Sequence, residues 1–352
     1  MDDEFWMREA LAEAAKGVGS TSPNPAVGAV VVGNGAILGR GFHRRAGEPH
    51  AEIEALRSLA DDSDARGATL YVTLEPCSTH GRTPPCVDAI IAAGIDRVVF
   101  GATDPNPRHA GRATQLLKAA GVQASGGVLA DECAALNVEF NRWIATGSPW
   151  VIAKAGLSLD GRLSRPPGES QWLTSPASRE HAMRLRTRVD AILIGAGTLR
   201  TDNPRLTIRG IPGFEQKQPW RIVLSRRGEL PEDAHLFTDE HRHRTLVYTN
   251  RPLADVLREL GEREMTSVLI EGGADVLGQA FDARLVDEVQ FYLAPLLCGG
   301  PHVIGGLGAG ATVESTGLRD ARYTQIGDDL HVSGFTRREA GPVYADASGA
   351  AL

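Results

Sequence analysis

The side chains best able to do chemistry together lie in the first quarter of the chain. His50 and Glu52 are separated by one residue, and Cys77, which follows a proline, precedes Cys86 by the spacer 78–85. One imidazole and two thiolates would fill three of the four positions that a zinc ion prefers, leaving the fourth for a water whose pKa the metal lowers. Glu52 is not a ligand in this arrangement and is the group that moves protons. The pattern predicts a zinc-dependent deaminase, although the general signature of base deaminases has a shorter C-x-x-C spacing.

Secondary structure explains how distant residues would meet at one metal. His50 and Glu52 stand at the expected start of a helix. The β-type run 71–74 leads to Cys77, and Cys86 precedes an expected helix over 87–93, so both thiols lie where a strand turns into a helix. Two readings compete with catalysis. In the first, the two cysteines are buried core residues and the histidine caps a helix. In the second, His80 adds a fourth ligand and the zinc site is a closed, structural one.

Two glycine-rich turns in the second half indicate a nucleotide site. Gly195-Ala196-Gly197-Thr198 follows the expected strand 191–194, and Glu271-Gly272-Gly273 follows the expected strand 267–270. Ligands of open α/β sheets bind at the carboxyl ends of strands, and a helix after Gly273 would offer its positive end to a phosphate. A complete G-x-G-x-x-G is absent, and tight structural turns are the alternative.

Several segments together carry a resemblance to a known family. They are Pro23–Val30, Thr73–Cys77 with the spacer 78–85, and Asp104–Pro107 in the first half, and Lys154–Gly161, Thr198–Thr207 and Glu271–Gly273 in the second. With them the chain resembles the bacterial bifunctional riboflavin-biosynthesis deaminase/reductase family over nearly its whole length. In that family the longer spacer between the cysteines is normal.

For the first half, the resemblance implies a cytidine-deaminase-like α/β/α domain with one zinc ion. Its substrate would be 2,5-diamino-6-ribosylamino-4(3H)-pyrimidinone 5′-phosphate. The metal ligands would be His50, Cys77 and Cys86, with Glu52 as the catalytic carboxylate. The positions that would contact this substrate are Asn24, His43, His80, Arg82, Asp104 and Asn106. Capping by Asn24 and an Asx turn at Asp104 are the plain alternatives.

For the second half, the resemblance implies a dihydrofolate-reductase-like α/β domain that uses NADPH to reduce the ribose to a ribityl chain. NADPH would contact Gly156, Trp172, Thr198, Asp202, Gly273, Ala274, Asp275, Val276, Leu277, Gly278 and Gln279. The substrate would contact Ser170, Arg186, Leu206, Arg209 and Glu271. Lys154, Asp202 and Glu271 are unranked candidates for polarising or protonating the reacting group.

Each of these residues could instead have an ordinary structural role. Arg186 could be a solvated helix residue, Trp172 could be part of the core, and Asp202-Asn203-Pro204 could be only a turn. Glu271 is harder to dismiss, because a carboxylate that ends a buried strand is costly without a partner.

Composition narrows the class of protein. The formal net charge of −7 argues against a surface that binds nucleic acid, and therefore against a deaminase that acts on polynucleotides. No apolar stretch is long enough for a membrane helix, and the residues after Met1 are acidic rather than basic. We therefore expect a cytoplasmic enzyme with small phosphorylated substrates and no membrane partner. Cys133 and Cys298 show no pairing pattern, and a homo-oligomer is expected only from the resemblance.

The order of expected elements gives two α/β domains and a tail. A hairpin around Asn34-Gly35 begins an alternation of helices and strands, and a helix over 129–146 ends at Gly147. Further strands are expected at 150–156, 191–194, 221–224, 245–248, 267–270 and 288–293. The predicted domains are the deaminase at 1–147 and the reductase at 148–339. Residues 340–352 form a predicted flexible tail.

Overall fold

The computed structural model describes residues 2–61, 65–79, 84–106, 109–163, 172–214, 217–299, 304–311 and 315–336. The chain divides after Thr146 into two compact units, and each has its own sheet and its own buried apolar cluster. No helix within the described residues is both long and apolar enough to cross a membrane. The predicted tail lies outside the described residues.

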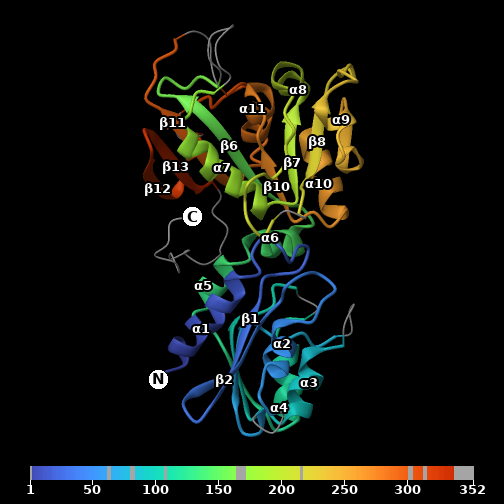
Figure 1. The fold of residues 1–352 in the computed structure, drawn as a ribbon, viewed down its shortest axis with the longest axis vertical. Helices are drawn as coiled ribbons and strands as arrows, with labels where there is room; N and C mark the ends of the chain where they lie inside the picture. The colour runs from blue at the N-terminus through green and yellow to red at the C-terminus, as the bar shows by residue number, and fades with distance from the viewer. Residues whose placement is uncertain are drawn as a thin grey trace. The chain divides into compact units, whose positions relative to one another are not determined.

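The first unit is built on one mixed sheet with the strand order β2-β1-β3-β4-β5 (Figure 1). Strand β1 is antiparallel to β2 and β3, whereas β3, β4 and β5 are parallel. The strands are β1 (Gly28–Gly33), β2 (Ala36–Phe42), β3 (Thr69–Leu74), β4 (Arg97–Ala102) and β5 (Gln123–Gly126). The helices are α1 (Asp3–Ala15), α2 (Ala51–Arg57), α3 (Cys86–Ala93), α4 (Arg112–Ala119), α5 (Ala130–Ala135) and α6 (Val138–Thr146).

Helices cover both faces of this sheet, with α1 and α5 on one side and α2, α3 and α4 on the other (Figure 1). Two glycines allow the close approach. A Cβ on Gly28 would lie 2.1 Å from a backbone oxygen of α1, and one on Gly41 would lie 2.2 Å from a backbone nitrogen of α2. Because Gly41 pairs with Ala29, the residue after Gly28, the two glycines face opposite sides of the pleat. The predicted hairpin is confirmed, with positive φ at Asn34 and Gly35.

The single helix expected over 129–146 is wrong. The structure has two helices, α5 and α6, which are separated at Leu136 and Asn137. The buried Asn137 side chain accepts a hydrogen bond from the Ala26 N–H at 2.7 Å and donates one to the Ala26 carbonyl at 2.8 Å. A tertiary contact therefore overrides the local helical pattern.

The second unit has the strand order β12-β13-β11-β6-β10-β7-β8-β9. Its strands from β11 to β9 are parallel, and β13 and β12 extend one edge in antiparallel pairing. The strands are β6 (Trp150–Ser158), β7 (Ala191–Gly195), β8 (Trp220–Ser225), β9 (Thr245–Thr249), β10 (Ser267–Ile270), β11 (Glu288–Ala294), β12 (Arg319–Ile326) and β13 (Asp329–Phe335). The helices are α7 (Pro176–Arg188), α8 (Ala196–Asp202), α9 (His235–Thr238), α10 (Leu253–Glu262) and α11 (Ala274–Asp282), with a 3-10 turn η2 (Arg242–Arg244).

The parallel strands were predictable because they are continuous apolar runs. Val151, Ala153 and Ala155 of β6 belong to the apolar cluster that also includes residues of α10 and α11, while α7 covers the opposite face (Figure 1). The expected strands from 150–156 to 288–293 are confirmed. Strands β12 and β13 were not predicted, because β12 is largely polar and exposed and shows no buried apolar face.

Candidate active sites

His50, Cys77 and Cys86 converge at one point of the first unit. The His50 Nδ1 atom lies 3.5 Å from the Cys77 sulfur and 3.4 Å from the Cys86 sulfur, and the three ligand atoms lie within 4.8 Å of one another. Tetrahedral zinc bonds of ordinary length would place such nitrogen and sulfur atoms about 3.6 Å apart. The donor set and its spacing therefore fit a zinc ion, and within the described residues the cluster consists of these three side chains.

The ends of two helices bring these ligands together. His50 is the N-cap residue of α2, but its side chain makes no capping hydrogen bond, so its ring can face the two sulfurs. Cys86 is the first residue of α3, and its backbone N–H donates to the Cys77 sulfur at 3.2 Å. The helix N-terminus thus stabilises a thiolate at Cys77, as expected for cysteines at such positions.

The pKa values of the two thiols are shifted in opposite directions. The hydrogen bond from the Cys86 thiol is the main cause that lowers the pKa of the Cys77 thiol to about 4, and His50 and the Cys86 backbone N–H contribute to the same shift. The hydrogen bond between the two thiols, together with burial, raises the pKa of the Cys86 thiol. In the protein alone the pair therefore shares one negative charge, and a divalent cation would hold both as thiolates.

Glu52 lies in the first turn of α2 and is 3% exposed. Burial, with the Cys77 thiolate as a second cause, raises the pKa of its carboxyl group to about 7. The structure thus places a buried carboxyl group beside the three ligands without making it one of them.

The expected substrate positions of this unit fall into two groups. Asn24 Nδ2 lies 3.1 Å from His43 Nε2, and the His43 ring packs edge-on against that of His50 at 5.3 Å. Asp104 accepts a hydrogen bond from the Asn106 N–H at 2.8 Å, which is the Asx turn of the plain alternative. His80 and Arg82 lie outside the described residues, so the closed structural site with His80 as a fourth ligand stays an alternative.

Sequence reasoning missed Glu75, which lies two residues before Cys77. Its buried carboxylate accepts hydrogen bonds from the backbone N–H groups of Gly111 at 2.9 Å and of Asp104 at 3.5 Å. It therefore ties the metal loop to both ends of the segment that carries Asn106. A carboxylate at the end of a buried strand, as at Glu271, was the available signal.

In the second unit a cavity of about 1530 Å³ lies over the carboxyl ends of the parallel strands. It is lined by most of the positions expected to contact NADPH or substrate, namely Gly156, Trp172, Arg186, Thr198, Asp202, Leu206, Arg209, Glu271, Gly273, Ala274, Asp275, Val276 and Gln279, and by Lys154. Leu277 and Gly278 do not line it. Leu277 is in the core, and a Cβ on Gly278 would lie 2.2 Å from the Gly305 backbone. Ser170 lies outside the described residues.

A buried ion pair forms part of the cavity lining. Arg186 on α7 donates two hydrogen bonds to Glu271, at 2.7 and 3.0 Å, and Lys154 Nζ lies 3.8 Å from the same carboxylate. Burial alone would raise the pKa of Glu271, but Arg186 and Lys154 outweigh it and hold the pKa at about 2. Glu271 is therefore ionised at neutral pH and is a poor proton donor. Arg186 is not a solvated helix residue, since its side chain is 12% exposed.

Asp202 differs from Glu271 in its surroundings. It is the last residue of α8, and its carboxylate accepts no hydrogen bond from any residue that the structure describes. Although the residue is exposed, neighbouring atoms partly exclude water from its carboxyl group, and this desolvation raises its pKa. A residue that only capped a turn would accept a backbone N–H, so the structure does not favour that reading.

The glycines in these turns are needed because neighbouring atoms approach closely, not because the backbone adopts a conformation that only glycine allows. Gly273 has φ −74° and ψ −179°, a conformation open to any residue. A Cβ there would lie 3.3 Å from Thr198 Oγ1, and one on Gly195 would lie 3.0 Å from Val276. The turns thus bring α8 and α11 close together, with the N-terminus of α11 at the cavity, where it suits a phosphate. Tyr292, Arg205 and Arg226 also line the cavity and were not predicted.

Family comparisons cover both units. Residues 1–102 match the cytidine and deoxycytidylate deaminase zinc-binding region, and residues 149–332 match the RibD C-terminal domain.

Similar proteins extend over most of the chain. The riboflavin biosynthesis protein RibD of Bacillus amyloliquefaciens is 39% identical over 95% of this chain and 96% of its own length. That of Escherichia coli (strain K12) is 41% identical over 85% of this chain and 89% of its own. Among solved structures, Acinetobacter baumannii RibD, form 1, has a TM-score of 0.88 at 35% identity, covering 96% of this chain and 99% of its own. A Thermotoga maritima diaminohydroxyphosphoribosylaminopyrimidine deaminase/5-amino-6-(5-phosphoribosylamino)uracil reductase has a TM-score of 0.84 at 33% identity, covering 95% and 98%.

Proposed function

The chain belongs to the RibD family of riboflavin biosynthesis proteins, and from this membership we infer that it catalyses two successive steps of that synthesis. It is a deaminase and a reductase, with zinc and NADPH as cofactors. The expected fold class is confirmed, with a cytidine-deaminase-like first unit and a dihydrofolate-reductase-like second unit. The deaminase substrate is 2,5-diamino-6-ribosylamino-4(3H)-pyrimidinone 5′-phosphate.

The convergence of His50, Cys77 and Cys86 beside buried Glu52 carries the deaminase half of this proposal. Zinc, when bound by the three ligands, supplies a Lewis acid that makes water nucleophilic near neutral pH. Glu52 takes the two protons of the attacking water in turn and passes one to the ring nitrogen and one to the departing ammonia. One water is consumed and one ammonia leaves, so the ring exchanges an amine for an oxygen.

The cavity of the second unit supports the reductase half. NADPH, when bound, supplies a hydride to C1′ of the sugar. Arg186 and Arg209 provide cationic groups for a phosphorylated substrate, and the bidentate ion pair holds Arg186 in place. Asp202 supplies the accompanying proton. Its raised pKa and the lack of a hydrogen-bond partner among the described residues favour it over Glu271.

Mass analysis of products tests both activities at once. The pure protein is incubated with the diaminopyrimidine ribosyl phosphate, with and without NADPH. We expect exchange of an amine for an oxygen in both samples and a further gain of two hydrogens only with NADPH. An unchanged substrate in both samples would contradict the proposal.

Two finer statements stay predictions. The domain limits at 1–147 and 148–339 and the homo-oligomeric state rest on the sequence pattern and the family. Sedimentation of the full chain at several concentrations tests the second of them.

A further inference from the structure

The second unit contains a charged side chain that neither activity uses. Arg221 lies on β8 and is 1% exposed, the largest fully buried side chain among the described residues. It does not line the cavity. Burying a guanidinium group is costly unless each of its donors finds an acceptor.

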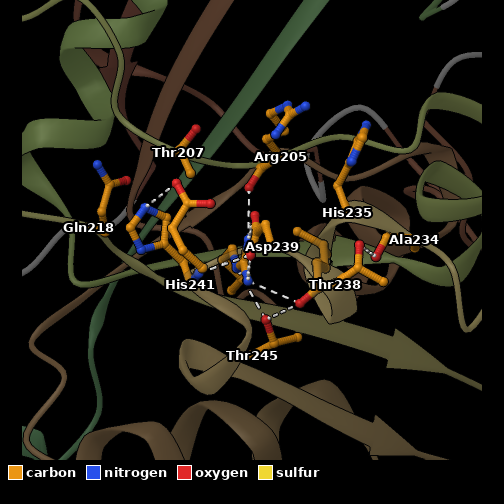
Figure 2. Close-up of polar contacts among 12 residues, drawn as sticks. Arg205, Thr207, Gln218, Ala234, His235, Thr238, Asp239, His241 and Thr245 are labelled. Carbon is orange, nitrogen blue, oxygen red and sulfur yellow. Dashed lines mark hydrogen bonds and ion pairs between the residues drawn. The ribbon is translucent and has the colours of Figure 1, made fainter.

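Every donor of Arg221 is satisfied, and the acceptors come from separate segments. Figure 2 labels three of the residues that supply them, Arg205, Asp239 and Thr245. Two hydrogen bonds reach Asp239, at 2.6 and 2.9 Å, and make a bidentate ion pair. Two more reach the Leu236 carbonyl at 3.0 Å and the Thr245 hydroxyl at 3.1 Å. The fifth reaches the backbone carbonyl of Arg205 at 3.3 Å.

The Arg205 carbonyl belongs to an irregular segment, residues 203–209, which lies between α8 and β8. Side chains from elsewhere hold its backbone. Besides Arg221, Arg186 donates to the Thr207 carbonyl at 2.8 Å, and Gln218 bonds both the N–H and the C=O of Ile208. Since the segment belongs to no strand or helix, these contacts decide its path.

The segment is also strained where Arg221 holds it. Leu206, the residue after Arg205, has φ +51°, and Asn203 has φ +41°. A branched side chain rarely adopts such a backbone conformation, which persists only where the surroundings enforce it. The Asn203 side chain is tied as well, because it accepts a hydrogen bond from the His235 N–H at 2.9 Å.

The strained segment borders the reductase cavity. Leu206 and Arg209 both line it and are among the positions expected to contact the reductase substrate. Loss of the hydrogen bond to the Arg205 carbonyl would let the strained backbone relax and so move both side chains. A small displacement of groups in a binding site has a large effect on the reaction.

We propose that the buried Arg221–Asp239 ion pair is a positioning device for the substrate-binding segment 203–209 of the reductase. It acts through the Arg205 carbonyl and through the 234–241 turn, without touching substrate or cofactor. The inference rests on the proposed reductase function and adds to it a determinant of substrate affinity.

The test compares Arg221→Lys with the control Val223→Ala in the full-length protein. Lysine keeps a positive charge beside Asp239 but has too few donors to reach Arg205 as well. Val223 lies on the same strand and is fully buried, and its truncation weakens the core without removing a hydrogen bond to the segment. Steady-state reduction is measured with the deaminated pyrimidine and NADPH varied separately, and deamination is the internal reference.

We expect Arg221→Lys to raise KM for the pyrimidine by about tenfold to a hundredfold, in the range of misplaced binding groups. KM for NADPH and the rate of deamination should change little. Val223→Ala should lower the folded fraction, and so the apparent kcat, at unchanged KM. A purely structural role for Arg221 predicts that the two variants behave alike.

Unchanged pyrimidine KM in folded Arg221→Lys, or an equal rise in Val223→Ala, overturns the proposal. If Arg221→Lys does not fold, Asp239→Asn decides, because it removes the negative charge and replaces one of the two acceptor oxygens by an NH2 donor, which breaks the bidentate pair that fixes the guanidinium group. The same unchanged KM there overturns the proposal. Absence of reduction by the wild-type protein is a different result and contradicts the proposed function itself.

Discussion

At the scale of single residues, the first unit separates metal binding from proton transfer. His50 and the two cysteines offer a nitrogen and two sulfurs, whereas Glu52 is buried beside them as a carboxyl group. The two roles therefore respond differently to substitution. A lost ligand weakens metal binding, but a carboxamide at position 52 leaves the ligands intact.

Glu52→Gln should retain zinc and lose deamination by about a hundredfold or more, because a carboxamide cannot carry the proton. Cys77→Ser should lose zinc as well as activity. Elemental analysis of the two purified variants, beside deamination assays, measures both effects. Full zinc occupancy in Cys77→Ser would show that the ligand assignment is wrong, and unchanged reduction by either variant shows that the effect is confined to the first unit.

Asp202→Asn tests the proton donor of the reductase. Since the Asp202 carboxylate lines the cavity and has no partner among the described residues, its loss should not unfold the turn. Reductase turnover should fall by about a hundredfold, the range of a lost acid-base group, while deamination is unchanged. Near-normal reduction would remove Asp202 and leave Lys154 as the remaining candidate, because Glu271 is ionised.

At the scale of elements, local pattern predicted the parallel strands and the ends of the helices that carry the metal ligands. It could not show that Arg186 meets Glu271, since these residues are far apart in the chain and meet only in the folded sheet. The local pattern also failed to predict where a tertiary hydrogen bond interrupts a helix. Asn137 fits the helical pattern of its neighbours, but its side chain forms hydrogen bonds with the backbone of Ala26, which lies far away in the sequence.

Asn137→Ala should therefore destabilise the first unit. The buried N–H and C=O of Ala26 would lose their partners, at a cost of about 2 kcal/mol or more. Asn141→Ala is the matched control, because among the described residues the Asn141 side chain makes a single hydrogen bond, to the Ala134 carbonyl at 3.0 Å. The urea concentration that halves deamination measures the effect, with reduction as the reference. Equal midpoints for the two variants would contradict a structural role for the Ala26 contact.

At the scale of the whole molecule, two unlike chemistries are built on two separate cores. The buried apolar clusters of the two units share no residue. The metal ligands all precede Thr146, and the lining of the large cavity all follows it. Each unit therefore has what a domain needs in order to fold around its own core.

A fragment that begins at Ser148 should then fold alone and reduce supplied deaminated substrate without zinc. Its NADPH binding is measured by fluorescence and its turnover by NADPH consumption, with the full-length protein treated with a zinc chelator as the matched control. Chelation should abolish deamination in the full chain and leave reduction intact, because the described residues of the second unit contain no group of three side chains placed to hold a metal ion. A fragment that folds and binds NADPH but turns over only when residues 1–147 are added would show that the reductase site needs the first unit. In that case separate cores would not imply separate active sites.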